Sequence, residues 1–162
     1  MTDPLTGVGT RHSFDAYAAQ HLDLAKRHGR NLSVMMVDMD NFKRVNDRHG
    51  HPAGDIVLST VGNLLRRELR QSDIICRYGG DEFAVLLPET STEEALELGH
   101  RVRLTVEDSF SESPYEVSAT IGIAGLDKQQ AENVWDLLKA ADIALYNGKT
   151  LGRNRISVTA PQ

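Results

Sequence analysis

A pair of adjacent glycines, Gly79-Gly80, lies between two apolar segments and constrains the fold of this chain more than any other feature. Such a pair predicts a β-hairpin, which here extends over residues 74–87. Asp81 and Glu82 follow the glycines directly and lead into the apolar residues 83–87. Because glycine has no side chain, we expect the space around these two carboxylates to be open to a ligand.

A second group of carboxylates ends another predicted strand. Residues 34–37 read Val-Met-Met-Val, which is typical of a buried strand, and they run directly into Asp38-Met39-Asp40. Side chains two positions apart in a strand share a face, so Asp38 and Asp40 are equal candidates for metal ligands. Two carboxylate clusters placed side by side repel each other unless a hard cation lies between them. The two patterns together predict a magnesium site.

Hydrophobic periodicity predicts the other elements. We expect helices from Phe14 to near Gly29, over residues 41–48, from Val57 to Leu69 and over residues 134–145. Another helix is expected to begin at a capping box formed by Ser91 and Glu94. Strands are expected over residues 117–123 and near Ile156. This order predicts an α+β domain, an α/β sandwich with a mostly antiparallel central sheet flanked by helices.

Composition limits the class of protein. The chain has 162 residues, of which 40% are hydrophobic, so we expect a single domain over residues 1–162. A net charge of -5 argues against a nucleic-acid-binding protein, whose binding surface would be basic. The one cysteine, Cys76, lies in an apolar run and is expected to be a core thiol, which fits a cytoplasmic location. No apolar stretch of about 18 residues occurs, so no membrane span is expected in this segment.

In this order the motifs resemble the GGDEF domain, the catalytic domain of diguanylate cyclases. The resemblance rests on Asp3-Pro4-Leu5-Thr6-Gly7, residues 38–43, Asn46-Asp47, residues 50–55, residues 77–83 and residues 149–155. It implies a palm-like nucleotide-cyclase fold and the condensation of two GTP into cyclic di-GMP and two pyrophosphates. It also implies a homodimer during catalysis. The start directly at the Asp3 motif suggests a domain excised from a longer protein with an upstream sensor domain.

The resemblance assigns the metal site and the catalytic acids. It implies that Asp38, Asp81 and the carbonyl of Met39 bind Mg²⁺ or Mn²⁺, two ions per GTP. Asp81 is the expected general base, and Glu82 is an assisting acid. Asp40 is then expected to be an N-cap or first-turn acid of the next helix.

Further positions match the family's substrate contacts. The helix start at Asn41, Phe42 and Lys43 is expected to bind phosphate through backbone amides. Lys149 and Arg153 match the family's phosphate-binding pair, although a lysine at a helix C-terminus is also a common cap. Asn46 and Asp55 match the positions that bind the guanine base, and a carboxylate at residue 55 favours GTP over ATP.

Residues 70–73 match the RxxD inhibitory motif of the family. The match implies that Arg70 and Asp73 bind the product, cyclic di-GMP, outside the active site, with Arg101 as a second cation. Two alternatives stay open from the residues alone. One is a non-catalytic GGDEF module that binds GTP or cyclic di-GMP, and the other is a related cyclase that makes a mixed or adenine dinucleotide.

Overall fold

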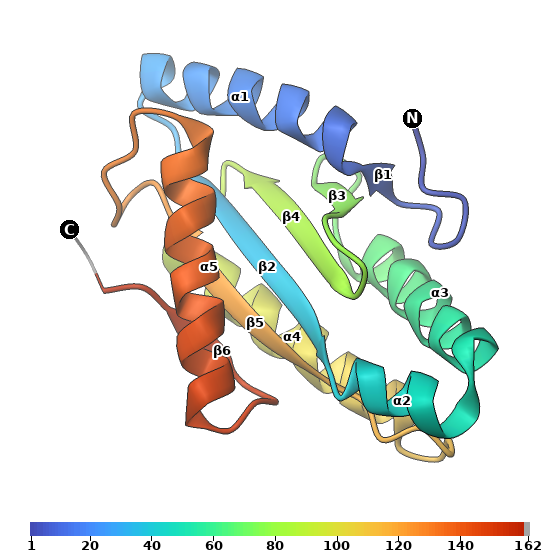
Figure 1. Ribbon diagram of the computed structural model, residues 1–162. Helices are drawn as coiled ribbons and strands as arrows, with labels where there is room; N and C mark the ends of the chain where they lie inside the picture. Colours follow the sequence, from blue (N-terminus) through green and yellow to red (C-terminus); the bar gives the residue numbers. More distant parts are fainter. Residues whose placement is uncertain (161–162) are drawn as a thin grey trace.

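A six-stranded sheet with helices on both faces forms the centre of the molecule (Figure 1). The structure is a computed structural model and describes residues 1–160; the last two residues of the expected domain lie outside this range. The elements along the chain are β1 (Gly9–Thr10), α1 (Arg11–His28), β2 (Leu32–Asp40), α2 (Phe42–His49), α3 (His51–Glu68), β3 (Ile74–Arg77), β4 (Glu82–Pro88), α4 (Thr92–Phe110), β5 (Ser118–Gly125), α5 (Val134–Leu151) and β6 (Ile156–Val158).

The sheet has the strand order β1-β3-β4-β2-β5-β6. The central strand β2 pairs antiparallel with both β4 and β5, and β3 and β4 form the predicted antiparallel hairpin. The two outer pairs, β1 with β3 and β5 with β6, are parallel. The prediction of a mostly antiparallel sheet in an α+β fold is therefore confirmed, with parallel pairing at both edges.

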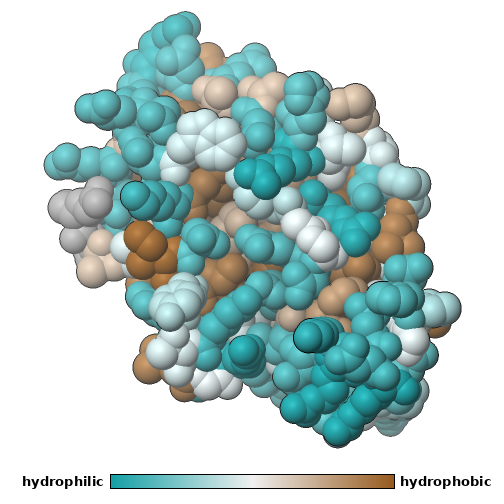
Figure 2. All heavy atoms as spheres, viewed as in Figure 1, coloured by the Kyte–Doolittle hydropathy of each residue, from teal (hydrophilic) through white to brown (hydrophobic). Residues whose placement is uncertain are grey.

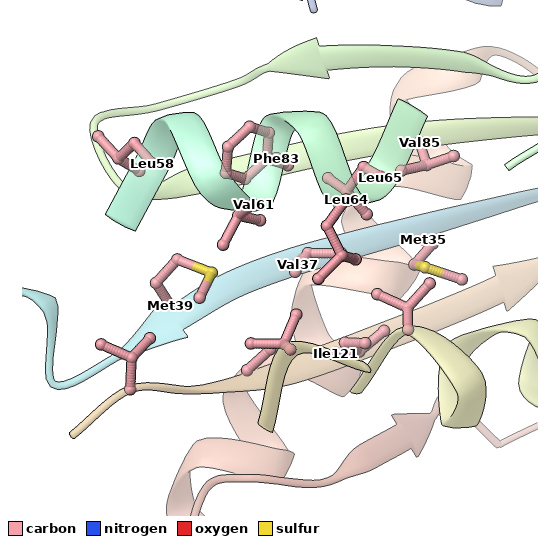
Figure 3. Close-up of a cluster of buried hydrophobic side chains, with 14 of the residues drawn as sticks. Met35, Val37, Met39, Leu58, Val61, Leu64, Leu65, Phe83, Val85 and Ile121 are labelled. Atoms are coloured by element: carbon pink, nitrogen blue, oxygen red, sulfur yellow. The ribbon is translucent and has the colours of Figure 1, made fainter. Parts of the chain in front are cut away.

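The two faces of the sheet are covered by different helices. Val34 and Met36 of β2 pack with residues of α1 and α5, whereas Met35 and Val37 pack with α3 and α4. Figure 3 shows the second of these clusters, in which side chains of α3 lie over those of β2 and β4. Every residue of β2 is buried, as expected for a strand covered on both faces. In Figure 1, α5 crosses the near side of the sheet and α4 lies behind it.

Local sequence signals set the ends of several helices. Helix α1 ends at Gly29, which adopts a left-handed conformation with φ 63°. The predicted capping box of Ser91 and Glu94 begins α4. Strand β1 was not predicted, because two residues are too few to show a periodicity. No helix within residues 1–160 is long and apolar enough to cross a membrane.

The single cysteine is a core residue, as predicted. Cys76 lies in β3 and is buried between the sheet and α1. Burial raises the pKa of its thiol to about 12. The thiol is therefore protonated at neutral pH and is a poor nucleophile.

Candidate active site

The hairpin between β3 and β4 lies beside the end of β2. Asp38 pairs with Glu82 across the β2–β4 ladder, and the amide of Met39 donates to the carbonyl of Asp81 at 3.1 Å. The two carboxylate segments that the sequence predicted to lie side by side thus meet at one end of the sheet. The structure brings together the four predicted catalytic and metal-binding residues, Asp38, Met39, Asp81 and Glu82.

Backbone contacts and Arg77 fix the shape of the turn. The guanidinium of Arg77 donates to the carbonyl of Gly80 at 2.9 and 3.2 Å, and it lies 3.6 Å from the carboxylate of Asp3. Neither Gly79 nor Gly80 has a positive φ. A methyl group added to Gly80 would meet no atom within 4 Å. The glycines therefore leave open space in front of the acids rather than relieve backbone strain.

The carboxylates are crowded and partly removed from water. Burial raises the pKa of Asp38. A hydrogen bond from Lys149 acts in the opposite direction, and the nearby carboxylates of Asp81 and Asp40 raise the pKa further. Burial also raises the pKa of Glu82 to about 7, with contributions from Asp38 and Asp142. Such a cluster is stabilised by any cation that approaches it.

Lys149 already supplies one positive charge to this cluster. It lies in the last turn of α5, and its ammonium group donates to Oδ2 of Asp38. Arg153 follows in the loop after α5 with φ 63° and is exposed. The predicted phosphate-binding pair therefore lies at the C-terminal end of α5, and Lys149 lies directly beside the predicted metal ligand. A helix cap would bind carbonyl groups of its own helix, so the alternative role of Lys149 as a cap does not explain its contact with Asp38.

Asp40 was assigned wrongly from the sequence. It belongs to β2 and is 2% exposed, and the N-cap position of α2 is Asn41. Its carboxylate accepts hydrogen bonds from Ser118 at 2.7 Å, from Thr120 at 2.6 Å and from the amide of Asn154 at 2.9 Å. Asp40 thus fastens the loop after α5 to the sheet. The strand continues three residues beyond the apolar residues 34–37, because residues 38–40 pair with β5 and the hydroxyls of β5 bind the Asp40 carboxylate. The local sequence does not show this tertiary pairing.

Helix α2 begins beside the carboxylates, as predicted. Asn41 has φ 62° and precedes Phe42, the first residue of the helix. The first amides of a helix have no intrahelical partner, so those near Phe42 and Lys43 are available to an anion. Figure 2 shows that hydrophilic residues gather over α2.

The two residues predicted to bind the base lie at the corner between α2 and α3. Oδ1 of Asn46 is buried and has no hydrogen-bond partner among the described residues. It lies against Gly54, where a Cβ would come within 1.9 Å of this oxygen. Asp55 follows Gly54 on α3 and is exposed. An unpartnered buried acceptor is suited to a ligand that donates hydrogen bonds, as the N1–H and N2–H groups of guanine do.

The RxxD motif forms a local ion pair. Arg70 lies 3.0 Å from Asp73, whose side chain is fully buried, and it also donates to Thr90 at 2.8 Å. Arg101 of α4 lies 3.3 Å from Glu68 at the end of α3. The side chain of Arg70 is 56% exposed and that of Asp73 is fully buried, so Arg70 is the member of the pair that solvent reaches.

The donor set suits a hard divalent cation. Asp38 and Asp81 offer carboxylates and Met39 a carbonyl, and oxygen ligands are those that Mg²⁺ and Mn²⁺ prefer. Within residues 1–160, no three or more His, Cys, Asp and Glu side chains form a metal-binding group by themselves. The predicted set includes only two such side chains, so it needs a backbone carbonyl and oxygens from water or a nucleotide to complete the coordination.

Comparisons with known proteins identify the family of this chain. The family described as "Diguanylate cyclase, GGDEF domain" matches residues 1–155. Diguanylate cyclase DgcP of Pseudomonas aeruginosa is 38% identical over 161 residues, which cover 98% of this chain and 24% of that protein. Diguanylate cyclase A of Treponema denticola is 35% identical over 164 residues, covering 98% of this chain and 44% of that protein.

A solved structure confirms the fold. The GGDEF domain of DgcB from Caulobacter crescentus, crystallised in complex with c-di-GMP, matches with a TM-score of 0.88 and 29% identity over 96% of this chain and 94% of that one. The chain belongs to the GGDEF domain family. It spans less than half the length of the two curated relatives described above.

Proposed function

We propose that this domain is a diguanylate cyclase that condenses two GTP molecules into cyclic di-GMP and two pyrophosphates. The observation that carries the proposal is the meeting of Asp38, Asp81 and Glu82 with Lys149 at one end of the sheet. Every position that the family uses for substrate carries a competent side chain in this sequence, which argues against the non-catalytic alternative. The presence of Asp55 argues against a cyclase that uses adenine nucleotides.

Asp38, Asp81 and the Met39 carbonyl would hold Mg²⁺ or Mn²⁺, two ions per GTP. When bound, such ions neutralise the triphosphate and lower the pKa of a ribose 3'-hydroxyl. The donor set described above fits them. Asp81 accepts the proton of the attacking 3'-hydroxyl, with Glu82 as the assisting acid.

The remaining residues hold the nucleotide. The start of α2 at Asn41, Phe42 and Lys43 donates amides to the phosphates, and Lys149 and Arg153 supply the positive charge that the acidic domain otherwise lacks. Asn46 and Asp55 accept hydrogen bonds from the guanine edge. As the 3'-oxygen bonds to the α-phosphorus, the bond to pyrophosphate breaks and pyrophosphate leaves.

Each domain binds one GTP, so two copies of the domain must meet for the reaction. The 3'-hydroxyl on one copy attacks the α-phosphate held by the other, and the second bond forms in the same way. We propose that the domain works inside a longer protein whose upstream sensor domain controls this meeting. The share of the relatives' length that this chain covers supports that proposal.

We also propose that cyclic di-GMP inhibits the enzyme at Arg70, Asp73 and Arg101. Arginine can donate two hydrogen bonds to the Hoogsteen edge of guanine. The buried carboxylate of Asp73 holds the Arg70 guanidinium in place by two contacts, at 3.0 and 3.4 Å. Asp73, Pro88 and Thr90 engage Nε and Nη2 of Arg70, so Nη1 is the nitrogen that would meet a guanine base.

The test of the proposed function is incubation of the purified domain with GTP and MgCl₂, followed by separation and mass analysis of the nucleotides. We expect cyclic di-GMP and pyrophosphate in a ratio of one to two, no product with ATP, and a rate per domain that rises with protein concentration. Hydrolysis of GTP without a cyclic dinucleotide, or binding of GTP without turnover, would overturn the proposal.

A further inference from the structure

The outer face of α5 carries a row of four exposed side chains that the proposed reaction does not use. Trp135, Lys139, Asp142 and Tyr146 are spaced by four, three and four residues, so they lie on one face of the helix. Trp135 is 50% exposed and Tyr146 is 70% exposed. We call these four residues the α5 stripe. Figure 2 shows residues of intermediate and high hydropathy along the course of α5.

The α5 stripe borders the candidate active site. A hollow of about 550 Å³ lies between α5 and the β3–β4 hairpin. Its lining includes Trp135, Lys139 and Asp142 of the stripe together with Arg11, Tyr78 and Glu82. A partner that covers the stripe would therefore also cover the approach to Glu82.

The order of residues in the stripe is symmetric about its middle. Trp135 and Tyr146 lie at the two ends, and Lys139 and Asp142 lie at equal distances on either side of the centre. A two-fold axis through that centre would place two such helices antiparallel, with each residue opposite its mirror position. Lys139 would then face Asp142 of the partner subunit, and Trp135 would face Tyr146 of the partner subunit.

We propose that the α5 stripe is the surface on which a second copy of this domain docks, with the two α5 helices antiparallel across a two-fold axis. This inference rests on the proposed function, because each site is incomplete without the GTP that the other copy holds. Two Lys–Asp pairs flank the axis and an aromatic pair lies at each end, so the surface is complementary to itself in charge and in apolar character. Ile143, which is 46% exposed beside Asp142, adds apolar surface near the axis.

The chemistry of the stripe favours a copy of itself over other occupants. An acidic polymer or an anionic lipid surface would require a cluster of cations, whereas the stripe has one lysine and one aspartate. The interface is small and its ion pairs are exposed, so the pairing is weak in dilute solution. Weak pairing beside the active site leaves the meeting of two domains open to control by other parts of a longer protein.

Charge reversal with complementation tests the proposal. The chain with Lys139→Asp presents two carboxylates at the centre of the stripe, and the chain with Asp142→Lys presents two ammonium groups. Either variant alone would repel its own copy, whereas a mixture of the two restores both opposite-charge pairs. We expect the rate of cyclic di-GMP formation per domain in dilute solution to fall about tenfold for each variant and to recover in the equimolar mixture.

Sedimentation velocity of the same samples gives a readout that needs no GTP. The mixture should sediment faster than either variant at the same total concentration, and Glu97→Lys, a charge reversal on the exposed face of α4, should behave as the wild type. A mixture that behaves as the average of its components in both measurements would overturn the docking surface, even if the wild type makes product. If the wild type makes no product but the mixture of the two variants still associates, the proposed function is overturned and the docking surface stands.

Discussion

Lys149, in the last turn of α5, donates its ammonium group to the carboxylate of Asp38 at the end of β2, 111 residues earlier in the chain. The contact joins a residue predicted to bind phosphate to one predicted to bind metal. A metal ion at Asp38 would have to share this carboxylate with the ammonium group of Lys149. Binding of GTP and metal is therefore expected to move Lys149 from the carboxylate to the phosphates.

This exchange predicts opposite effects of Lys149→Gln on two ligands. Without nucleotide, Mn²⁺ should bind the variant about threefold to tenfold more tightly, because Asp38 no longer has a competing cation. GTP should bind about tenfold more weakly, because a phosphate contact is lost. Titration calorimetry measures both affinities. Lys128→Gln, a change at an exposed lysine outside the site, is the control, and weaker Mn²⁺ binding by Lys149→Gln would contradict the exchange.

Gly54→Ala is expected to weaken GTP binding through Asn46. The new Cβ would lie 1.9 Å from Oδ1 of Asn46 and 3.1 Å from the ring of Phe42, so the amide must move. We expect a loss of GTP affinity of about tenfold, close to the effect of Asn46→Ala. In the Asn46→Ala background, Gly54→Ala should have little further effect, because the side chain that it displaces is already gone. Additive losses in the double variant would place base recognition elsewhere.

The raised pKa of Glu82 predicts a pH dependence of stability in the metal-free protein. The pKa is about 7 in the folded state against 4.5 for an ordinary glutamate, so the folded state holds an extra proton between these values. Stability should therefore increase as the pH falls from about 8 to about 5. Comparison of the urea midpoints of Glu82→Gln and the wild type isolates the contribution of Glu82. The variant should be more stable than the wild type at the higher pH, and its urea midpoint should change less between about pH 8 and about pH 5. Glu97→Gln is the control on α4, and an equal slope in Glu82→Gln and the wild type would argue against the shift.

Much of the fold could be predicted from the sequence because its signals are local. The hairpin follows from Gly79-Gly80, the start of α4 from Ser91 and Glu94, and the central strand from its apolar residues. Residues predicted to act together at the end of β2 do lie together, since the strands that carry them pair directly. Their roles in binding and catalysis remain predictions.

What the sequence did not predict depends on contacts between distant elements. The place of Asp40 is fixed by Ser118 and Thr120 of β5, and that of Lys149 by Asp38. The unpartnered oxygen of Asn46 depends on how α2 meets α3. An aspartate two residues after a predicted metal ligand gives a weak signal by itself. The alternating hydroxyls of Ser118 and Thr120 in a later predicted strand are the pattern that could have pointed to the partners of Asp40.

Product inhibition is expected to depend on the forked shape of the Arg70 side chain. Arg70→Lys keeps the charge beside the buried Asp73 but loses the paired donors, so the fold is retained while guanine recognition weakens. We expect cyclic di-GMP to bind the wild type with a dissociation constant in the micromolar range and Arg70→Lys about tenfold more weakly. Inhibition should be relieved without a change in GTP affinity. Arg30→Lys, at an exposed arginine beside Glu89, serves as the control, and equal calorimetric titrations of Arg70→Lys and the wild type would refute the inhibitory site.

The central claim is that the carboxylates at the end of β2 and in the hairpin turn carry the condensation of GTP. The most direct measurement is the amount of cyclic di-GMP formed from GTP and MgCl₂ by Asp38→Ala and Asp81→Ala, beside Asp108→Ala, which changes an exposed aspartate on α4. Circular dichroism verifies that each variant is folded. We predict that Asp38→Ala and Asp81→Ala form no cyclic di-GMP while Asp108→Ala matches the wild type, and near-normal turnover by a folded Asp38→Ala or Asp81→Ala chain would contradict the claim.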